Sequence, residues 1–138
     1  MTDLGQLVTA LGSLARLVPA SAGLVGVGWA TVDTDRSLRD LVTDGSLTFG
    51  PAVSEPALGA RARVAWSGST AILVLEPSTE GRLAAALARR GEGIACLYVA
   101  GPEPTGSTRI TALGRPGRIL PHDRPWGPYV LLVDPAPR

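Results

Sequence analysis

The first part of the chain has the periodicity of an amphipathic helix. Between residues 2 and 18, apolar side chains recur three or four positions apart, as on one helical face: Leu4, Leu7, Val8, Leu11, Leu14, Ala15, Leu17 and Val18. Thr2 and Asp3 suit the start of a helix, and Pro19 ends it. We therefore expect an N-terminal helix over residues 1–20 that packs against the domain formed by residues 21–138 or against a second subunit.

Apolar runs of strand length make up most of the remaining chain. They predict strands at Leu24–Val32, Ala60–Trp66, Thr70–Leu75, Ile94–Ala100, Arg118–Leu120 and Tyr129–Val133, and a short candidate strand at Ser46–Phe49. Within the second of these, Arg61 and Arg63 alternate with apolar residues. This pattern predicts that the arginines point outward, whereas the inward positions are Ala62, Val64 and Trp66. Ser67, Gly68 and Ser69 then form a hairpin turn.

Two further helices are predicted. A short one is capped by Thr34 or Asp35 and runs to residue 41 or 42. The clearest helix covers residues 79–90, with Ser78 or Thr79 as its cap and Gly91 at its end.

Two similar strands indicate an internal repeat. Ile72–Pro77 and Val130–Pro135 each contain four apolar residues, an acid and a proline. Each closes a half that opens with another strand, which predicts a β-α-β-β-β module and its copy. The second copy is shorter by about ten residues, and its Pro- and Gly-rich segment 101–117 shows at most one helical turn, near residues 110–113. Chance similarity between two apolar strands is the alternative.

Four segments carry a resemblance to a known superfamily: Val27–Asp33, Ile72–Pro77, Leu83–Ile94 and Gly127–Pro135. Over about residues 24–135 the sequence resembles the vicinal oxygen chelate proteins, which include glyoxalases, dioxygenases, bleomycin-resistance proteins and methylmalonyl-CoA epimerases. The epimerase and glyoxalase-like branch is the most similar. The resemblance implies an α+β fold with two β-α-β-β-β modules, at about 24–78 and 92–135, that form a curved sheet with a cleft. The second module is shortened, and the N-terminal helix is an addition.

The resemblance also gives the places where a metal would bind. Metal-dependent members take four ligands, one from the first and one from the last strand of each module. These positions fall near Gly26, Leu73, Cys96 and Leu131, and the four strands contain no His, Glu, Gln or Asp. Apolar side chains and a thiol lack the oxygen and imidazole donors of a divalent ion site. We expect a metal-free, divergent member without a cofactor, in which the former metal site forms the floor of an apolar pocket.

Few residues are candidates for acid–base catalysis. His122 and Asp123 lie on a proline-rich loop, and a histidine titrates near neutral pH. Glu76 and Asp134 share the repeat position just after a strand. The alternatives are a solvated loop histidine and carboxylates that cap turns. We take His122, Glu76 and Asp123 as the candidate catalytic residues.

Ligand contacts are expected from the aromatic residues and the strand positions that face the cleft. The candidates are Trp29, Trp66, Leu73, Cys96, Tyr98, Trp126, Tyr129 and Leu131. Core or rim packing is the alternative for each aromatic residue, and an inert core thiol is the alternative for Cys96.

Composition excludes several function classes. All 13 basic residues are arginines, they are scattered along the chain, and aromatic residues make up 4%. A nucleic-acid site requires clustered cations and stacking rings, so we expect none. The absence of lysine excludes Schiff-base and P-loop chemistry. The apolar runs are too short to cross a membrane, and we expect a soluble, cytoplasmic protein without a signal peptide.

Two functions remain. The first is a metal-independent isomerase, cyclase or lyase of bacterial secondary metabolism. It would act in the apolar cleft on an apolar or planar small molecule of polyketide, acyl or peptide origin. The second is a non-catalytic protein that sequesters an antibiotic or a similar small molecule. A homodimer is expected in either case, and an interaction module that uses the N-terminal helix is a third possibility.

Overall fold

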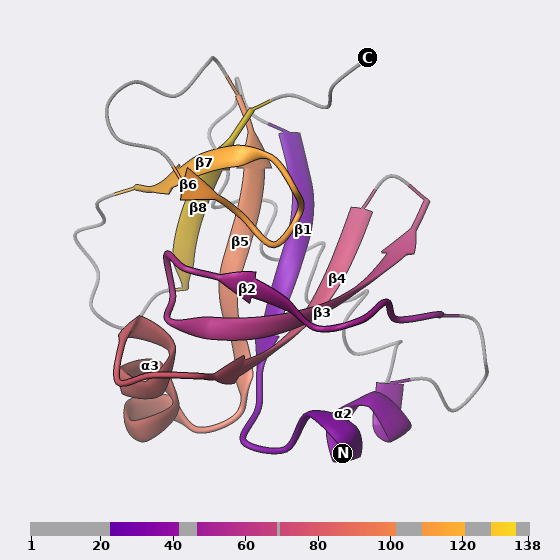
Figure 1. The fold of residues 1–138 in the computed structure, drawn as a ribbon, viewed down its shortest axis with the longest axis vertical. Helices are drawn as coiled ribbons and strands as arrows, with labels where there is room; N and C mark the ends of the chain where they lie inside the picture. Colours follow the sequence, from indigo (N-terminus) through magenta and orange to yellow (C-terminus); the bar gives the residue numbers. More distant parts are fainter. Residues whose placement is uncertain (1–22, 42–46, 69, 102–108, 121–127, 135–138) are drawn as a thin grey trace.

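An eight-stranded curved sheet with two helices forms the described part of the chain (Figure 1). This computed structural model describes residues 23–41, 47–68, 70–101, 109–120 and 128–134. The predicted N-terminal helix lies outside these residues. The elements are β1 (Gly23–Ala30), α2 (Thr34–Leu41), β2 (Val53–Glu55), β3 (Ala60–Ser67), β4 (Thr70–Pro77), α3 (Arg82–Arg90), β5 (Gly93–Ala100), β6 (Arg109–Ile110), β7 (Pro116–Ile119) and β8 (Tyr129–Val133). The predicted α+β fold is confirmed.

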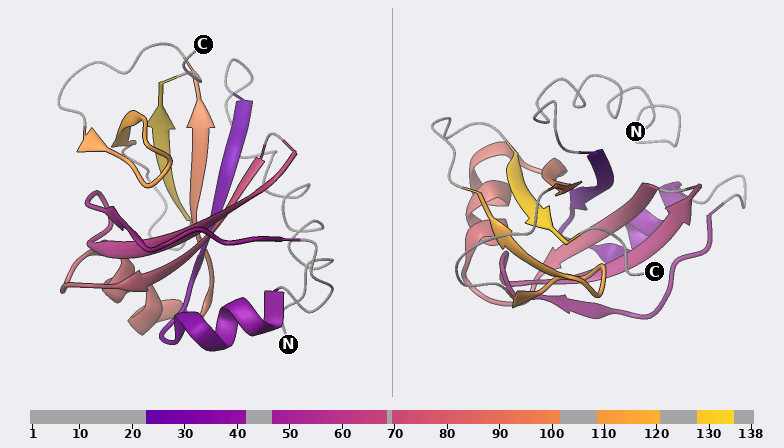
Figure 2. Two further views of the ribbon diagram at one scale, coloured as in Figure 1. Left: turned by 45° about the vertical axis from the view of Figure 1, so that its right-hand side comes forward. Right: turned by 90° about the horizontal axis from the view of Figure 1, so that it is seen from above.

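Strand order shows that the sheet consists of two related halves. The order is β2-β3-β4-β1-β5-β8-β7-β6, so β1 and β5 meet in the middle as an antiparallel pair. The last strand of each half runs parallel to its first strand: β4 pairs with β1, and β8 pairs with β5. The repeated apolar segments therefore occupy equivalent positions in the two modules. In Figure 2 the two ends of the sheet curl toward the same side.

The sheet has two faces with separate clusters of buried side chains. The face toward which the ends curl, here called the inner face, carries the larger cluster, which includes Leu73, Cys96, Tyr98 and Leu131. The opposite, outer face carries a smaller cluster of Leu47, Ala65, Ile72 and Val74, against which Leu38 of α2 packs. Successive strand residues point to opposite faces, so each residue's position in its strand determines the cluster that it joins.

Both edge strands of the sheet differ from the prediction. Residues 47–50 form no strand, and the edge strand β2 lies further along the chain, at Val53–Glu55. Residues 109–110 form β6, a strand that the sequence did not indicate, and a single turn follows in which the Gly114 N–H donates to the Thr111 carbonyl oxygen. Short edge strands are stabilised by pairing with one neighbour, so local apolar periodicity identifies them poorly.

The helices begin at other residues than the sequence suggested. At α2 the Asp33 Oδ1 atom accepts the Arg36 N–H at 3.1 Å, so Asp33 caps the helix instead of Thr34 or Asp35. α3 starts at Arg82 with Gly81 as its N-cap. Before it, the N–H groups of Ser78 and Thr79 both donate to the Gly59 carbonyl oxygen, which holds this segment against the β2–β3 turn. The predicted end at Gly91 is confirmed.

None of the helices in the described ranges is long and apolar enough to cross a membrane.

Candidate functional site on the inner face

The four positions that resemble metal-ligand positions do come together on the inner face. Gly26, Leu73, Cys96 and Leu131 lie on the four central strands β1, β4, β5 and β8. Leu73, Cys96 and Leu131 are 0% exposed. A Cβ atom added at Gly26 would lie 3.3 Å from Leu73 Cδ1, so little space is left beside this glycine. Side chains thus pack closely at these four positions.

This set of side chains does not fit a divalent cation. Two leucines, a glycine and a buried thiol provide no oxygen or imidazole donor. Across the part of the chain that the structure describes, no group of three or more His, Cys, Asp and Glu side chains is placed to hold an ion. We therefore assign no step at this face to a metal.

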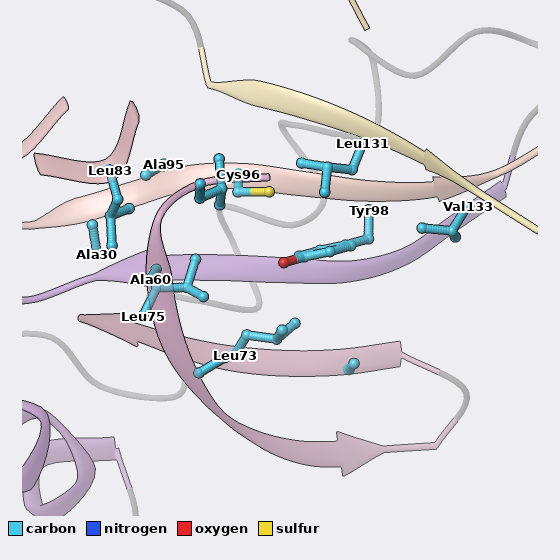
Figure 3. Close-up of a cluster of buried hydrophobic side chains, with 13 residues drawn as sticks. Ala30, Ala60, Leu73, Leu75, Leu83, Ala95, Cys96, Tyr98, Leu131 and Val133 are labelled. Atoms are coloured by element: carbon cyan, nitrogen blue, oxygen red, sulfur yellow. The ribbon is translucent and has the colours of Figure 1, made fainter. Parts of the chain in front are cut away.

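A buried carboxyl group, Glu55, provides the ionisable chemistry of the inner face. Glu55 ends the edge strand β2, and its side chain is 0% exposed. Its Oε1 atom accepts a hydrogen bond from the Tyr98 hydroxyl and a second from the Ala112 N–H at 3.0 Å. Its Oε2 atom is buried and has no hydrogen-bond partner among the described residues. Figure 3 shows Tyr98 with its hydroxyl directed into the middle of the cluster.

Burial sets the protonation behaviour of this group. Desolvation raises the pKa of Glu55, while the hydrogen bonds from Tyr98 and the Ala112 N–H, together with the nearby Ala57 N–H, oppose the rise. Desolvation also raises the pKa of Cys96 and of Tyr98 well above their usual values. The thiol and the phenol therefore stay neutral at physiological pH. A neutral, fully buried thiol is a poor nucleophile, which agrees with an inert role for Cys96.

The arrangement suits proton transfer at one defined oxygen. Oε1 accepts two hydrogen bonds, whereas the buried Oε2 accepts none, so Oε2 is the oxygen on which a proton would reside. A buried polar atom without a partner is uncommon in proteins and calls for an explanation. Carboxyl groups with raised pKa values in apolar surroundings are typical general acids and bases.

The candidate Glu76 occupies the other face of the sheet. Glu76 is two residues after Val74 on β4, so both side chains point to the outer face. Its Oε1 atom accepts hydrogen bonds from the Thr34 N–H at 3.2 Å and the Thr34 hydroxyl at 3.1 Å. Glu76 thus binds the first residue of α2, which agrees with the alternative that this carboxylate has a structural, capping role instead of a catalytic one. His122 and Asp123 lie outside the described residues.

The aromatic candidates are spread over three environments. Tyr98 is central to the inner face, and half-buried Tyr129 packs against the same cluster. Trp29 packs against the cluster on the outer face. Trp66 was expected to point inward from β3, but it lies near the end of that strand and is 46% exposed. Trp126 lies outside the described residues. Among the described residues, the tryptophans therefore do not form a stacking surface for a ligand on the inner face.

The sequence interpretation missed Glu55. The residues around it, Ala52 to Leu58, match no motif and have no clear strand periodicity. Its inward orientation follows from pairing, because Glu55 is opposite Ala60, and Ala60 belongs to the inner cluster. The sequence shows only that Glu55 follows the small apolar residues Ala52 and Val53 and precedes Pro56. This does not indicate that the carboxyl group is buried.

Comparison with known proteins identifies the fold. No protein-family model matches the sequence, and no curated protein matches it. Among solved structures, methylmalonyl-CoA epimerase from Mycobacterium tuberculosis is 20% identical with a TM-score of 0.72, over 89% of this chain and 96% of that one. A hypothetical protein from Bacillus halodurans is 19% identical with a TM-score of 0.71, over 86% and 97%.

A third similar structure contains a ligand. It is a variant of Streptomyces coelicolor methylmalonyl-CoA epimerase in complex with 2-nitronate-propionyl-CoA, 16% identical with a TM-score of 0.70, over 83% of this chain and 97% of that one. At these identities the similarity is one of fold. It confirms the vicinal oxygen chelate fold that the sequence predicted.

Proposed function

We propose that this protein is an isomerase-type enzyme that moves a proton on a small acyl substrate, and that Glu55 Oε2 is the atom that takes up and returns the proton. The observation that carries this proposal is the buried Glu55 carboxyl, with one oxygen fixed by Tyr98 and Ala112 and the other without a partner in the described structure. Glu55 replaces Glu76 in this role because Glu76 lies on the outer face.

The chemistry requires a carbon acid next to a carbonyl. Ionised Glu55 takes the proton from this carbon: the C–H bond breaks, an O–H bond forms at Oε2, and the electron pair moves into an enolate. Neutral Glu55 then returns the proton to carbon and is ready for another cycle. The raised pKa brings this carboxyl closer to neutral pH, where one group serves efficiently as both base and acid.

The proposed mechanism uses no metal, because Gly26, Leu73, Cys96 and Leu131 provide no oxygen or imidazole donor for one. Stabilisation of an enolate then needs hydrogen-bond donors or a cation from the protein. His122 and Asp123 remain candidates for this role and for a second acid–base group. Because Glu55 is fully buried, the substrate has to displace part of the packing on the inner face to reach it.

The substrate class is proposed from the similar structures. Two of the three described above are methylmalonyl-CoA epimerases, which supports an acyl-CoA thioester with an acidic α-hydrogen as the first substrate to test. A tailoring step in bacterial secondary metabolism, a cytoplasmic location and a homodimer remain predictions from the sequence.

Deuterium exchange tests the proposal directly. The protein is incubated with methylmalonyl-CoA, and separately with propionyl-CoA, in D2O, and deuterium at the α-carbon is followed by NMR. We expect exchange with at least one thioester and a loss of about 100- to 10,000-fold in E55Q, the range typical of a general acid–base group. Glutamine keeps the shape and the acceptor oxygen of Glu55 but cannot carry the proton.

E80Q is the matched control, because Glu80 is an exposed glutamate before α3 and lies outside the inner face. It should exchange at the wild-type rate. Equal exchange rates in E55Q and wild type would contradict the role of Glu55. Tight binding of a thioester without any exchange would favour the sequestering protein instead of the enzyme.

A further inference from the structure

A cavity lies at the edge of the sheet, beside β2. It has a volume of about 440 Å³ and is lined by Ala52, Val53, Ser54, Arg61, Ser78 and Thr79. These residues come from the β2 region, from β3 and from the segment between β4 and α3. Volumes of this order are typical of sites for small molecules. Arg61 alternates with the inward-facing Ala60 and Ala62, so it lies on the outer face, opposite to the proposed catalytic carboxyl.

The two arginines of β3 have different surroundings. Arg63 donates from Nε to the Gly50 carbonyl oxygen at 2.6 Å and from Nη2 to the Phe49 carbonyl oxygen at 3.4 Å, so it fastens a loop to the sheet. Arg61 is exposed, and its guanidinium has no hydrogen bond or ion pair within the described ranges. Its cross-strand neighbour Glu76 is hydrogen-bonded to Thr34. Arg61 is therefore available to a ligand.

The other polar side chains of the cavity are hydroxyls. Ser54 pairs directly with Arg61 in the β2–β3 ladder, and Ser78 and Thr79 are held close by their N–H bonds to the Gly59 carbonyl oxygen. No carboxylate lines the cavity. A carboxylate has two oxygens, and a guanidinium alone can pair with both of them. The three additional hydroxyl donors of this cavity match the larger number of oxygens on a phosphate group.

We propose that this cavity binds the phosphate group of a small molecule, with Arg61 as the charged contact and Ser54, Ser78 and Thr79 as hydroxyl contacts. The proposal does not depend on the proposed proton transfer, because Arg61 and its strand partner Ser54 alternate with the inward-facing Ala60 and Glu55 and so point to the opposite face.

Titration with inorganic phosphate tests this site. Backbone amide NMR signals of ¹⁵N-labelled full-length protein are followed at constant ionic strength, and sodium acetate serves as the carboxylate probe. We expect saturable shifts at Ser54, Arg61, Ser78 and Thr79, with phosphate binding more tightly than acetate. R61Q should weaken phosphate binding at least tenfold. R61K should weaken it less, because lysine keeps the charge but not the bidentate fork.

R39Q is the control, because Arg39 is an exposed arginine in the last turn of α2 that does not line the cavity. It should bind phosphate like the wild type. Equal affinity in R61Q and wild type, an equal loss in R39Q, or acetate binding as tightly as phosphate would each overturn the proposal. If thermal unfolding shows that R61Q does not fold, the phosphate affinity of R61K is the test instead. An R61K affinity equal to that of the wild type would contradict the bidentate contact of Arg61.

Discussion

The Tyr98 hydroxyl donates a hydrogen bond to Glu55 Oε1, and this contact joins the two halves of the sheet. Glu55 belongs to the edge strand of the first module, whereas Tyr98 lies on the first strand of the second module. The Ala112 N–H, from the turn after β6, donates to the same oxygen. One carboxyl group therefore connects three segments that are far apart in the sequence, across the inner face. Its removal should affect stability as well as any proton transfer.

Replacement of Tyr98 with phenylalanine removes a buried donor and leaves Glu55 with the Ala112 N–H. We expect Y98F to lower the free energy of unfolding by about 1–3 kcal/mol, the usual cost when a buried polar group loses its partner. Urea denaturation measures this change. Y129F is the matched control on the half-buried rim, and it should cost less than Y98F. Equal stabilities of Y98F and wild type would show that the contact contributes little.

The raised pKa of Glu55 predicts a specific dependence of stability on pH. The folded state holds the proton more tightly than the unfolded state, whose pKa is near the ordinary value of 4.5. The contribution to stability is thus fully present below about pH 4.5 and is lost as the pH rises through the folded pKa. In that window the wild type should lose stability relative to E55Q, by up to about 1.4 kcal/mol per pH unit.

Urea unfolding of both proteins over a series of pH values measures this difference, and parallel curves would contradict it. The comparison with E55Q is needed because Glu92 acts in the opposite direction. Hydrogen bonds from the Val32 N–H and the Thr31 hydroxyl lower the pKa of Glu92. Its stabilising contribution is present above the unfolded pKa and is lost as the pH falls, in E55Q and wild type alike.

Gly28 allows the close approach of side chains on the inner face. A Cβ atom at this position would lie 2.6 Å from Leu75 Cδ1 and 3.1 Å from Cys96 Cβ. We expect G28A to reduce stability by about 1–3 kcal/mol through overpacking. G23A is the control on the same strand, because no atom lies within 4 Å of a Cβ at Gly23. Thermal unfolding of both variants checks this, and a G28A protein as stable as G23A would show that the core adjusts without cost.

The sequence predicted the long strands and both described helices because their signals are local. Tyr129–Val133 has the predicted bounds, and the helix before Gly91 ends where a glycine allows a positive φ, here 75°. The similarity of Ile72–Pro77 and Val130–Pro135 indicated the two modules, and β4 and β8 hold equivalent places in the sheet. The short strands β2 and β6 were missed because each is stabilised by a single neighbouring strand.

The site was only partly predictable. Leu73, Cys96, Tyr98 and Leu131 share the inner face as expected, because a resemblance fixed their strands and alternation fixed their direction. Trp29 was assigned to the same site but packs on the outer face, since the alternation along β1 places it opposite to Gly28. Glu55 was missed because the feature that distinguishes it, burial beside Tyr98, involves residues 43 positions apart.

The sequence alone determined the long strands, the helix before Gly91, the repeat and the residue types at the four strand positions, because residue types and their spacing establish these directly. The tertiary structure decided which charged groups have partners. It buried Glu55 and bonded it to Tyr98 and Ala112, it fixed Glu76 to α2, and it left Arg61 beside a cavity. Desolvation and partner geometry depend on strands that are brought together by folding, and the chemistry of these groups depends on desolvation and partners.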